Sequence, residues 1–212
     1  MAQLGFYHNA DNCIGCKACM VACKDKNNLP LGEKMRKVYD QAACEWVVDE
    51  NGGYNPTNFF AYSVSVACNH CSNPACLPAC PVGAIHKREE DGIVYREEEQ
   101  CIGCGSCARA CPYEAPYVSL ESGTSRKCDF CMDLIDKGET PYCVAACPMR
   151  CLEYGDIEEL RAEHGDLCAI APIPAETGTE PNIVFTPNRL NADGAIEGIT
   201  LNEPQEVVSQ TV

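Results

Sequence analysis

Residues 101–112 read CIGCGSCARACP, and residues 13–23 read CIGCKACMVAC. Both stretches place four cysteines in the spacing C-x2-C-x2-C-x3-C and share several further residues, so the chain contains an internal repeat. Three closely spaced thiolates on a short loop can hold one side of a [4Fe-4S] cluster, and the x3 step carries the fourth cysteine one helical turn away. The spacing therefore predicts cluster binding, with the fourth cysteine of each run left for a different cluster.

Two further cysteine groups follow a looser plan, and each ends in C-x3-C-P. One group is followed by Pro81 and the other by Pro148. Sixteen of the nineteen cysteines are thus placed by a rule. The three cysteines outside the pattern, Cys44, Cys151 and Cys168, are interpreted as small buried residues. The members of the two looser groups are Cys68, Cys71, Cys76 and Cys80, and Cys128, Cys131, Cys143 and Cys147.

The segment between the second and third groups indicates how the groups pair. Residues 86–90 and 93–96 read as two short strands around a turn at Asp91-Gly92, which delivers the chain directly to Cys101. In two-cluster ferredoxins the fourth cysteine of each run binds the other cluster, so runs come in pairs. The second and third groups are then one unit, and the first and fourth pair across it. The predicted ligand sets are Cys68, Cys71, Cys76 with Cys111; Cys101, Cys104, Cys107 with Cys80; Cys13, Cys16, Cys19 with Cys147; and Cys128, Cys131, Cys143 with Cys23.

The predicted fold class is α+β, with two ferredoxin-like modules that each hold two [4Fe-4S] clusters, one module being inserted in the other. The outer module comprises residues 1–60 and 125–165, and the inserted module comprises residues 61–124. Residues 166–212 are predicted to form an extended tail that packs on a partner. Strands are expected at residues 45–48 and 59–67, and a short helix at residues 156–164 with Asp156 as its cap.

Composition excludes several classes of function. Sixteen basic and 31 acidic residues give a formal net charge of −15, which argues against nucleic acid as a partner. No apolar run approaches the roughly 18–20 residues that cross a bilayer, and the N-terminus does not read as an export signal. We therefore expect a soluble or peripheral protein that folds in a reducing cytoplasm. No phosphate-binding loop or catalytic motif is present, so no catalytic residue is predicted and the chain is not expected to be an enzyme by itself.

Alternatives remain open at this point. C-x2-C pairs are also typical of structural zinc sites, although triple runs ending in C-P fit clusters better. A free multi-cluster ferredoxin would show the same four groups. His70 lies inside an already complete cysteine group, so packing beside the metal site is the expected role. Trp46 and the aromatic residues 59, 60 and 62 are expected in a core or an interface.

With all four groups in place, the chain resembles the iron-sulfur subunit of the dimethyl sulfoxide reductase family of molybdopterin oxidoreductases. The resemblance runs nearly end to end. Besides the cysteine groups, it rests on Phe60-Ala61-Tyr62 ahead of Cys68, on residues 160–167, on Ala171-Pro172 and on residues 181–184. Relatives of the nitrate reductase type have Trp at the position of Cys104, so this cysteine implies four complete [4Fe-4S] clusters.

The resemblance implies an electron-transfer role in anaerobic respiration. Electrons would pass between a quinol-oxidising membrane anchor, or another donor, and a molybdopterin catalytic subunit. Such subunits are exported folded with a twin-arginine-bearing partner, which implies the outer face of the cytoplasmic membrane, or the cytoplasm if the partner lacks that signal. The substrate is expected to be a sulfoxide. Amine oxides, sulfur or selenium oxyanions, catechols and formate are the alternatives, because specificity belongs to the catalytic subunit.

Overall fold

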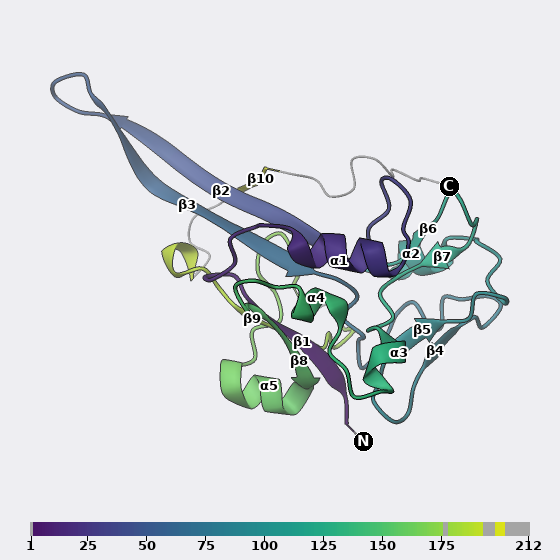
Figure 1. Ribbon diagram of the computed structural model, residues 1–212. Coiled ribbons are helices and arrows are strands. Elements are labelled where there is room, and N and C mark those ends of the chain that lie inside the picture. The colour runs from purple at the N-terminus through teal and green to yellow at the C-terminus, as the bar shows by residue number, and fades with distance from the viewer. Residues whose placement is uncertain (1, 176–177, 193–197, 202–212) are drawn as a thin grey trace.

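The computed structural model describes residues 2–175, 178–192 and 198–201 (Figure 1). Its central sheet joins segments from the two ends of the chain. Strand β1 (Leu4–Asn9) pairs antiparallel with β8 (Leu152–Asp156) and parallel with β9 (Ile183–Thr186). Side chains alternate across a strand, so Phe6 of β1 joins the main core on one face while Tyr7 points to the other.

Helix α5 (Ile157–His164) covers the second face of this sheet. Ile157 and Leu160 pack there against Tyr7 and Val184. The Asp156 carboxylate accepts hydrogen bonds from the backbone N–H groups of residues 158 and 159, at 2.9 and 3.4 Å, which satisfies two of the free donors at the helix start. The predicted helix and its cap are therefore confirmed.

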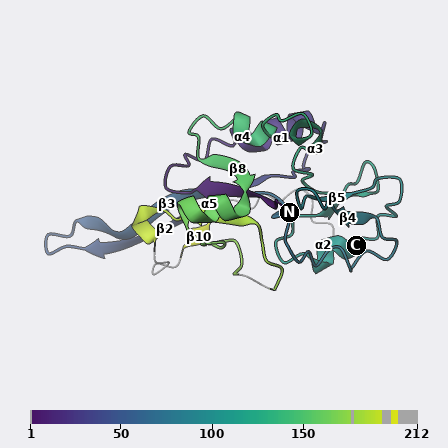
Figure 2. The same ribbon diagram turned by 90° about the horizontal axis from the view of Figure 1, so that it is seen from below.

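A long hairpin projects from the body of the protein (Figures 1 and 2). It consists of β2 (Lys37–Val48) and β3 (Tyr54–Val66), and β10 (Ile199–Thr200) adds a third strand beside β2. At its root Val38 and Val64 are buried in the main core, whereas at its tip Trp46 is 63% exposed. The strands predicted at residues 45–48 and 59–67 lie within this hairpin, which is longer than the pattern indicated.

Short elements surround the cysteine groups. The predicted hairpin is confirmed as β4 (Ile85–Lys87) and β5 (Val94–Arg96), which pair antiparallel. Strands β6 (Tyr117–Val118) and β7 (Ser125–Arg126) pair in a second small sheet. The predicted module boundary at residues 124 and 125 falls between these two strands, directly before β7. The helices beside the cysteines are α1 (Ala18–Lys26), α2 (Ser106–Ala110), α3 (Met132–Ile135) and α4 (Tyr142–Ala145).

The C-terminal segment contains structure that the sequence pattern did not predict. Residues 166–182 carry no helix or strand where they are described, but β9 then enters the central sheet with Ile183, Val184 and Phe185 buried. A 3-10 turn at Arg189–Asn191 follows, and β10 joins the long hairpin. The predicted tail continues to residue 212, and residues 202–212 lie outside the described part. Among the described residues, no helix has the length and apolar character of a membrane span.

Candidate metal centres

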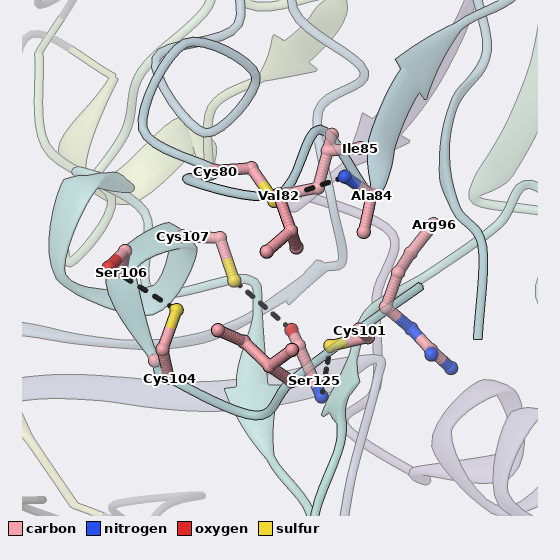
Figure 3. A pocket seen from close by; sticks show the side chains of 12 residues that line it. Cys80, Val82, Ala84, Ile85, Arg96, Cys101, Cys104, Ser106, Cys107 and Ser125 are labelled. Carbon is pink, nitrogen blue, oxygen red and sulfur yellow. Dashed lines mark hydrogen bonds between the residues drawn. The ribbon is translucent and has the colours of Figure 1, made fainter. Parts of the chain in front are cut away.

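Four predicted ligands from two cysteine groups line one cavity (Figure 3). Cys101 and Cys104 come from the loop that leads into α2, Cys107 lies in the first turn of α2, and Cys80 comes from the loop before β4. Backbone N–H groups lie beside two of the sulfurs: Ala84 N is 3.2 Å from Cys80 Sγ, and the Ser125 N–H donates to Cys101 Sγ at 3.3 Å. Such donors stabilise thiolates and reduced clusters.

Two more cavities have the same construction. One is lined by Cys68, Cys71 and Cys76 together with Cys111, the fourth cysteine of the neighbouring run. The other is lined by Cys13, Cys16 and Cys19 together with Cys147. The three cavities are alike in size, with about 320, 350 and 320 Å³ of space that includes some open solvent. In each, a trio from one group meets the last cysteine of its predicted partner group.

The fourth predicted set lies where α1 packs beside α4. Cys23, Cys128, Cys131 and Cys143 are all buried. Burial raises the pKa of Cys23 to about 12, with Arg36 opposing the shift and the neighbouring Cys143 and Cys131 adding to it. Burial likewise raises the pKa of Cys128 well above its usual range, and Cys23 and Cys143 again contribute. The structure therefore brings this set together as well.

Burial disfavours free thiolates at several predicted ligands. It raises the pKa of both Cys71 and Cys76 to about 12. At the half-buried Cys104, hydrogen bonding with the side chain and backbone of Ser106 instead lowers the thiol pKa. Metal ligation removes the thiol protons, so binding at the buried positions is coupled to proton release. Sixteen cysteines arranged in four groups have the donor type and number that [4Fe-4S] clusters require.

The two repeated runs have the same backbone geometry. Gly15 and Gly103 have φ values of +64° and +68°, and the residues before α1 and α2, Lys17 and Gly105, have φ values of +62° and +70°. A Cβ on Gly103 would collide with the backbone carbonyl oxygen of Gly123, so this position requires glycine. The repeat in the sequence is thus also a repeat in structure.

The cysteines outside the predicted sets differ from one another. Cys151 is buried, as expected, and its Sγ lies 3.4 Å from Cys147 Sγ in the Cys13 cavity. The expectation of burial is wrong for Cys44, which is exposed at a β-bulge of the long hairpin, and Cys168 is half-buried. Among the described residues, no three His, Cys, Asp or Glu side chains are arranged to hold a single metal ion.

Two histidines pack beside the cysteine sets. His70 is fully buried, accepts a hydrogen bond from the Val94 N–H at Nδ1 (3.0 Å) and packs edge-on against Phe130, in line with the expected packing role. His8 lines the Cys13 cavity, and no spacing rule indicated it. The only sequence signal for His8 was its position in the short, largely apolar run that forms β1.

Comparison with known proteins gives the class of the protein first. Residues 59–157 match the model of a 4Fe-4S dicluster domain, and residues 4–25 match that of a 4Fe-4S binding domain. The protein is therefore a ferredoxin-like iron-sulfur protein.

Individual relatives then define the family. The sequence is 46% identical over 206 residues to YnfG, a probable anaerobic dimethyl sulfoxide reductase subunit of Escherichia coli (strain K12), covering 97% of this protein and 98% of the relative. It is 42% identical over 208 residues to the B subunit of the anaerobic dimethyl sulfoxide reductase of Haemophilus influenzae, covering 98% and 100%. Selenate reductase subunit beta of Thauera selenatis is 44% identical over 146 residues, covering 67% and 44%. This protein belongs to the family of anaerobic dimethyl sulfoxide reductase B subunits, which are electron-transfer subunits and not catalytic ones.

Proposed function

We propose that the sixteen cysteines hold four [4Fe-4S] clusters in the four crosswise sets given above. The observation that carries this proposal is that each of three cavities is lined by a trio from one cysteine group and the last cysteine of another. The outer module would comprise residues 1–60 and 125–165, and the inserted module residues 61–124. Each bound cluster would supply reversible one-electron transfer.

The chain's own residues would set how each cluster is held. The αL residues at the starts of α1 and α2 turn the loops so that three sulfurs face one cavity. Hydroxyls repeat at the third cysteine of each run: Ser65 Oγ is 3.2 Å from Cys19 Sγ, and Ser125 Oγ is 3.2 Å from Cys107 Sγ. The surrounding apolar core keeps water away from the buried set at Cys128.

In this proposal the protein relays electrons from a quinol-oxidising membrane anchor, or another donor, to a molybdopterin catalytic subunit. Membership of the reductase family supports a catalytic partner. The exposed aromatic tip of the long hairpin, with Trp46 and Tyr54, offers apolar surface of the kind that interfaces bury. Within residues 166–212, strands β9 and β10 join this chain's own sheets, and the rest of this segment would pack on that partner. The assembly would lie on the outer face of the cytoplasmic membrane if the partner carries a twin-arginine signal.

Metal analysis with ligand variants tests the crosswise sets. We expect about sixteen iron and sixteen sulfide per chain in anaerobically prepared protein, and paramagnetic signals on reduction. Cys23 is proposed to bind the cluster of the Cys128 set. The variants Cys23→Ser and Cys131→Ser should therefore lose the same paramagnetic signal, that of this cluster. Loss of the same signal in Cys23→Ser and Cys16→Ser would contradict the crosswise arrangement, and four zinc with negligible iron would contradict the proposal altogether.

The substrate follows from the partner. We propose a sulfoxide, because the relatives with the fullest coverage are named for dimethyl sulfoxide reductase. The similarity to a selenate reductase subunit keeps oxyanion reductases as the second candidate. Co-purification from the native host, followed by identification of the large subunit and assay with both substrate classes, separates the two. A stable, independent, cluster-loaded monomer in the host would instead favour a free ferredoxin.

A further inference from the structure

Arg36 is a buried cation in an unusual setting. It lies directly before β2 and is only 1% exposed. Its Nη1 donates to Ser65 Oγ at 3.2 Å and to the Ser65 carbonyl oxygen at 3.4 Å, while Nε and Nη2 have no hydrogen-bond partner among the described residues. An arginine in the interior is normally matched by a carboxylate, and within the described part of the chain the polar contacts of Arg36 are to Ser65 alone.

The surroundings of Arg36 are cysteines of two different predicted sets. Ser65 Oγ, which receives the Nη1 hydrogen bond, is also 3.2 Å from Cys19 Sγ. The guanidinium carbon lies 4.8 Å from the centre of the Phe6 ring, inside the same core that contains Cys128 and Cys143. The side chain therefore lies between the Cys13 set and the Cys128 set.

Electrostatics agree with this placement. Burial acts to lower the pKa of Arg36, but the nearby cysteines 143, 19, 128 and 23 outweigh it, so the pKa is raised. Arg36 in turn acts to lower the pKa of Cys19, Cys23 and Cys128, although burial keeps all three raised. A permanent charge that is dry and close to two sets of sulfur ligands interacts with both more strongly than a surface charge can, because water does not screen it.

We propose that Arg36 is a fixed counter-charge shared by the two outer clusters, and that it raises the reduction potential of both. The inference rests on the proposed function, since it requires clusters in the Cys13 and Cys128 sets. Reduction adds a negative charge to a cluster, and a buried positive charge nearby stabilises that reduced form. In return, the negative charge of the clusters and their thiolates replaces the carboxylate that Arg36 lacks.

A second buried cation, Lys127, lies between the Cys128 set and the inserted pair, which makes the expected effect of Arg36 selective. Lys127 is 6% exposed, and its Nζ donates to the Val94 and Cys128 carbonyl oxygens. Its charge acts on Cys76 of the inserted module. Arg36 is therefore expected to shift the potentials of the outer pair more than those of the inserted pair.

Redox titration of the cluster-loaded protein, followed by electron paramagnetic resonance, tests this. Signals of the outer pair are identified beforehand by the ligand variants described above. In Arg36→Gln we expect the two outer clusters to become harder to reduce by at least tenfold in the reduction equilibrium, which is about 59 mV each. Arg36→Lys keeps the charge and should recover most of that shift. Arg109→Gln removes an exposed arginine beside Cys104 and should change no potential by a comparable amount.

The outcomes are distinguishable. Unchanged outer potentials in Arg36→Gln, or an equal shift of all four clusters, would overturn the inference. If Arg36→Gln loses the outer clusters, their retention in Arg36→Lys supports the proposed role of the positive charge. Loss of the outer clusters in both variants overturns the inference. If the wild-type protein does not hold four clusters, the proposed function itself is contradicted. Iron analysis of the wild-type protein, done before any variant is made, measures this.

Discussion

The runs at residues 13–23 and 101–111 have the same cysteine spacing and the same loop geometry, yet their surroundings differ. The first run continues into the nine-residue helix α1, which packs beside α4, and its last cysteine, Cys23, is buried near Arg36. The second run continues into the five-residue helix α2, and its last cysteine, Cys111, is half-buried. Spacing therefore fixes how sulfurs are presented, whereas the packing around them fixes how polar their environment is.

The largest expected effect comes from changing one ligand in each environment. Cys128→Ser places a hydroxyl in a buried set, so we expect the whole cluster of that set to be lost and the iron content to fall to about twelve per chain. Cys104→Ser affects a ligand that is only half-buried, where water can hydrate the hydroxyl, and should cost less than one whole cluster. Iron analysis and circular dichroism measure both. Cys168→Ser, outside the sets, is the control, and equal iron loss in the two ligand variants would remove the distinction.

A smaller effect is expected at the paired glycines. Gly103→Ala would drive a methyl group into the rigid backbone carbonyl of Gly123, whereas Gly15→Ala would meet the side chains of Ser63 and Asp40, which can move. Both changes force an ordinary residue into the left-handed region, at about 1–2 kcal/mol. We expect a total cost of about 3 kcal/mol or more for Gly103→Ala only. Anaerobic denaturant unfolding measures the difference in stability. Similar unfolding midpoints for the two variants would show that the backbone at Gly123 shifts as readily as the side chains near Gly15, which contradicts the prediction.

The residues that start the two helices offer a finer comparison. Lys17 and Gly105 share the left-handed conformation, and a Cβ on Gly105 would meet no atom closer than 3.2 Å. Gly105→Ala should therefore cost only about 1 kcal/mol. Lys17→Gly should relieve backbone strain and so stabilise the protein by about as much. It also removes the 2.6 Å ion pair with Asp40, worth roughly 0.2–1 kcal/mol, so little net change in stability is expected. Thermal unfolding of the loaded proteins checks both signs.

An effect as small as that of Gly105→Ala is expected at Cys151. Its sulfur is buried beside Cys147 but is not needed to complete the Cys13 set. Cys151→Ala should cost about 1 kcal/mol, as expected for a small cavity, and should leave all sixteen irons in place. The paramagnetic signal of the Cys13 cluster is then the one that changes shape. Loss of four irons would instead make Cys151 a ligand.

Local features were predicted well because they depend on nearby residues. The turn at Asp91-Gly92 and the Asp156 cap have sequence signatures that span four or five positions, and the structure contains both. The convergence of the cysteine trios also followed from spacing. For the cysteines, the structure shows which residues line each cavity, and ligation itself stays a prediction.

Long-range features could not be predicted from such signatures. Strand β9 pairs with β1 across more than 170 residues, and nothing in residues 183–186 indicates that partner. The interior position of Arg36 contradicts the rule that charged residues lie at the surface, and only the three-dimensional position of the cysteines explains it. Cys44 is the opposite case, since a residue type that is usually buried lies on an exposed bulge.

The central position of β1 also sets an order of assembly. This strand is synthesised well before its two neighbours, β8 and β9, which end at residues 156 and 186. The cysteines of the inserted pair, by contrast, are all present once residue 111 has been synthesised. With the proposed ligand sets, the inserted pair then has all of its sulfurs while the outer pair still lacks residues 125–165, so metal loading during translation would supply the inserted pair first.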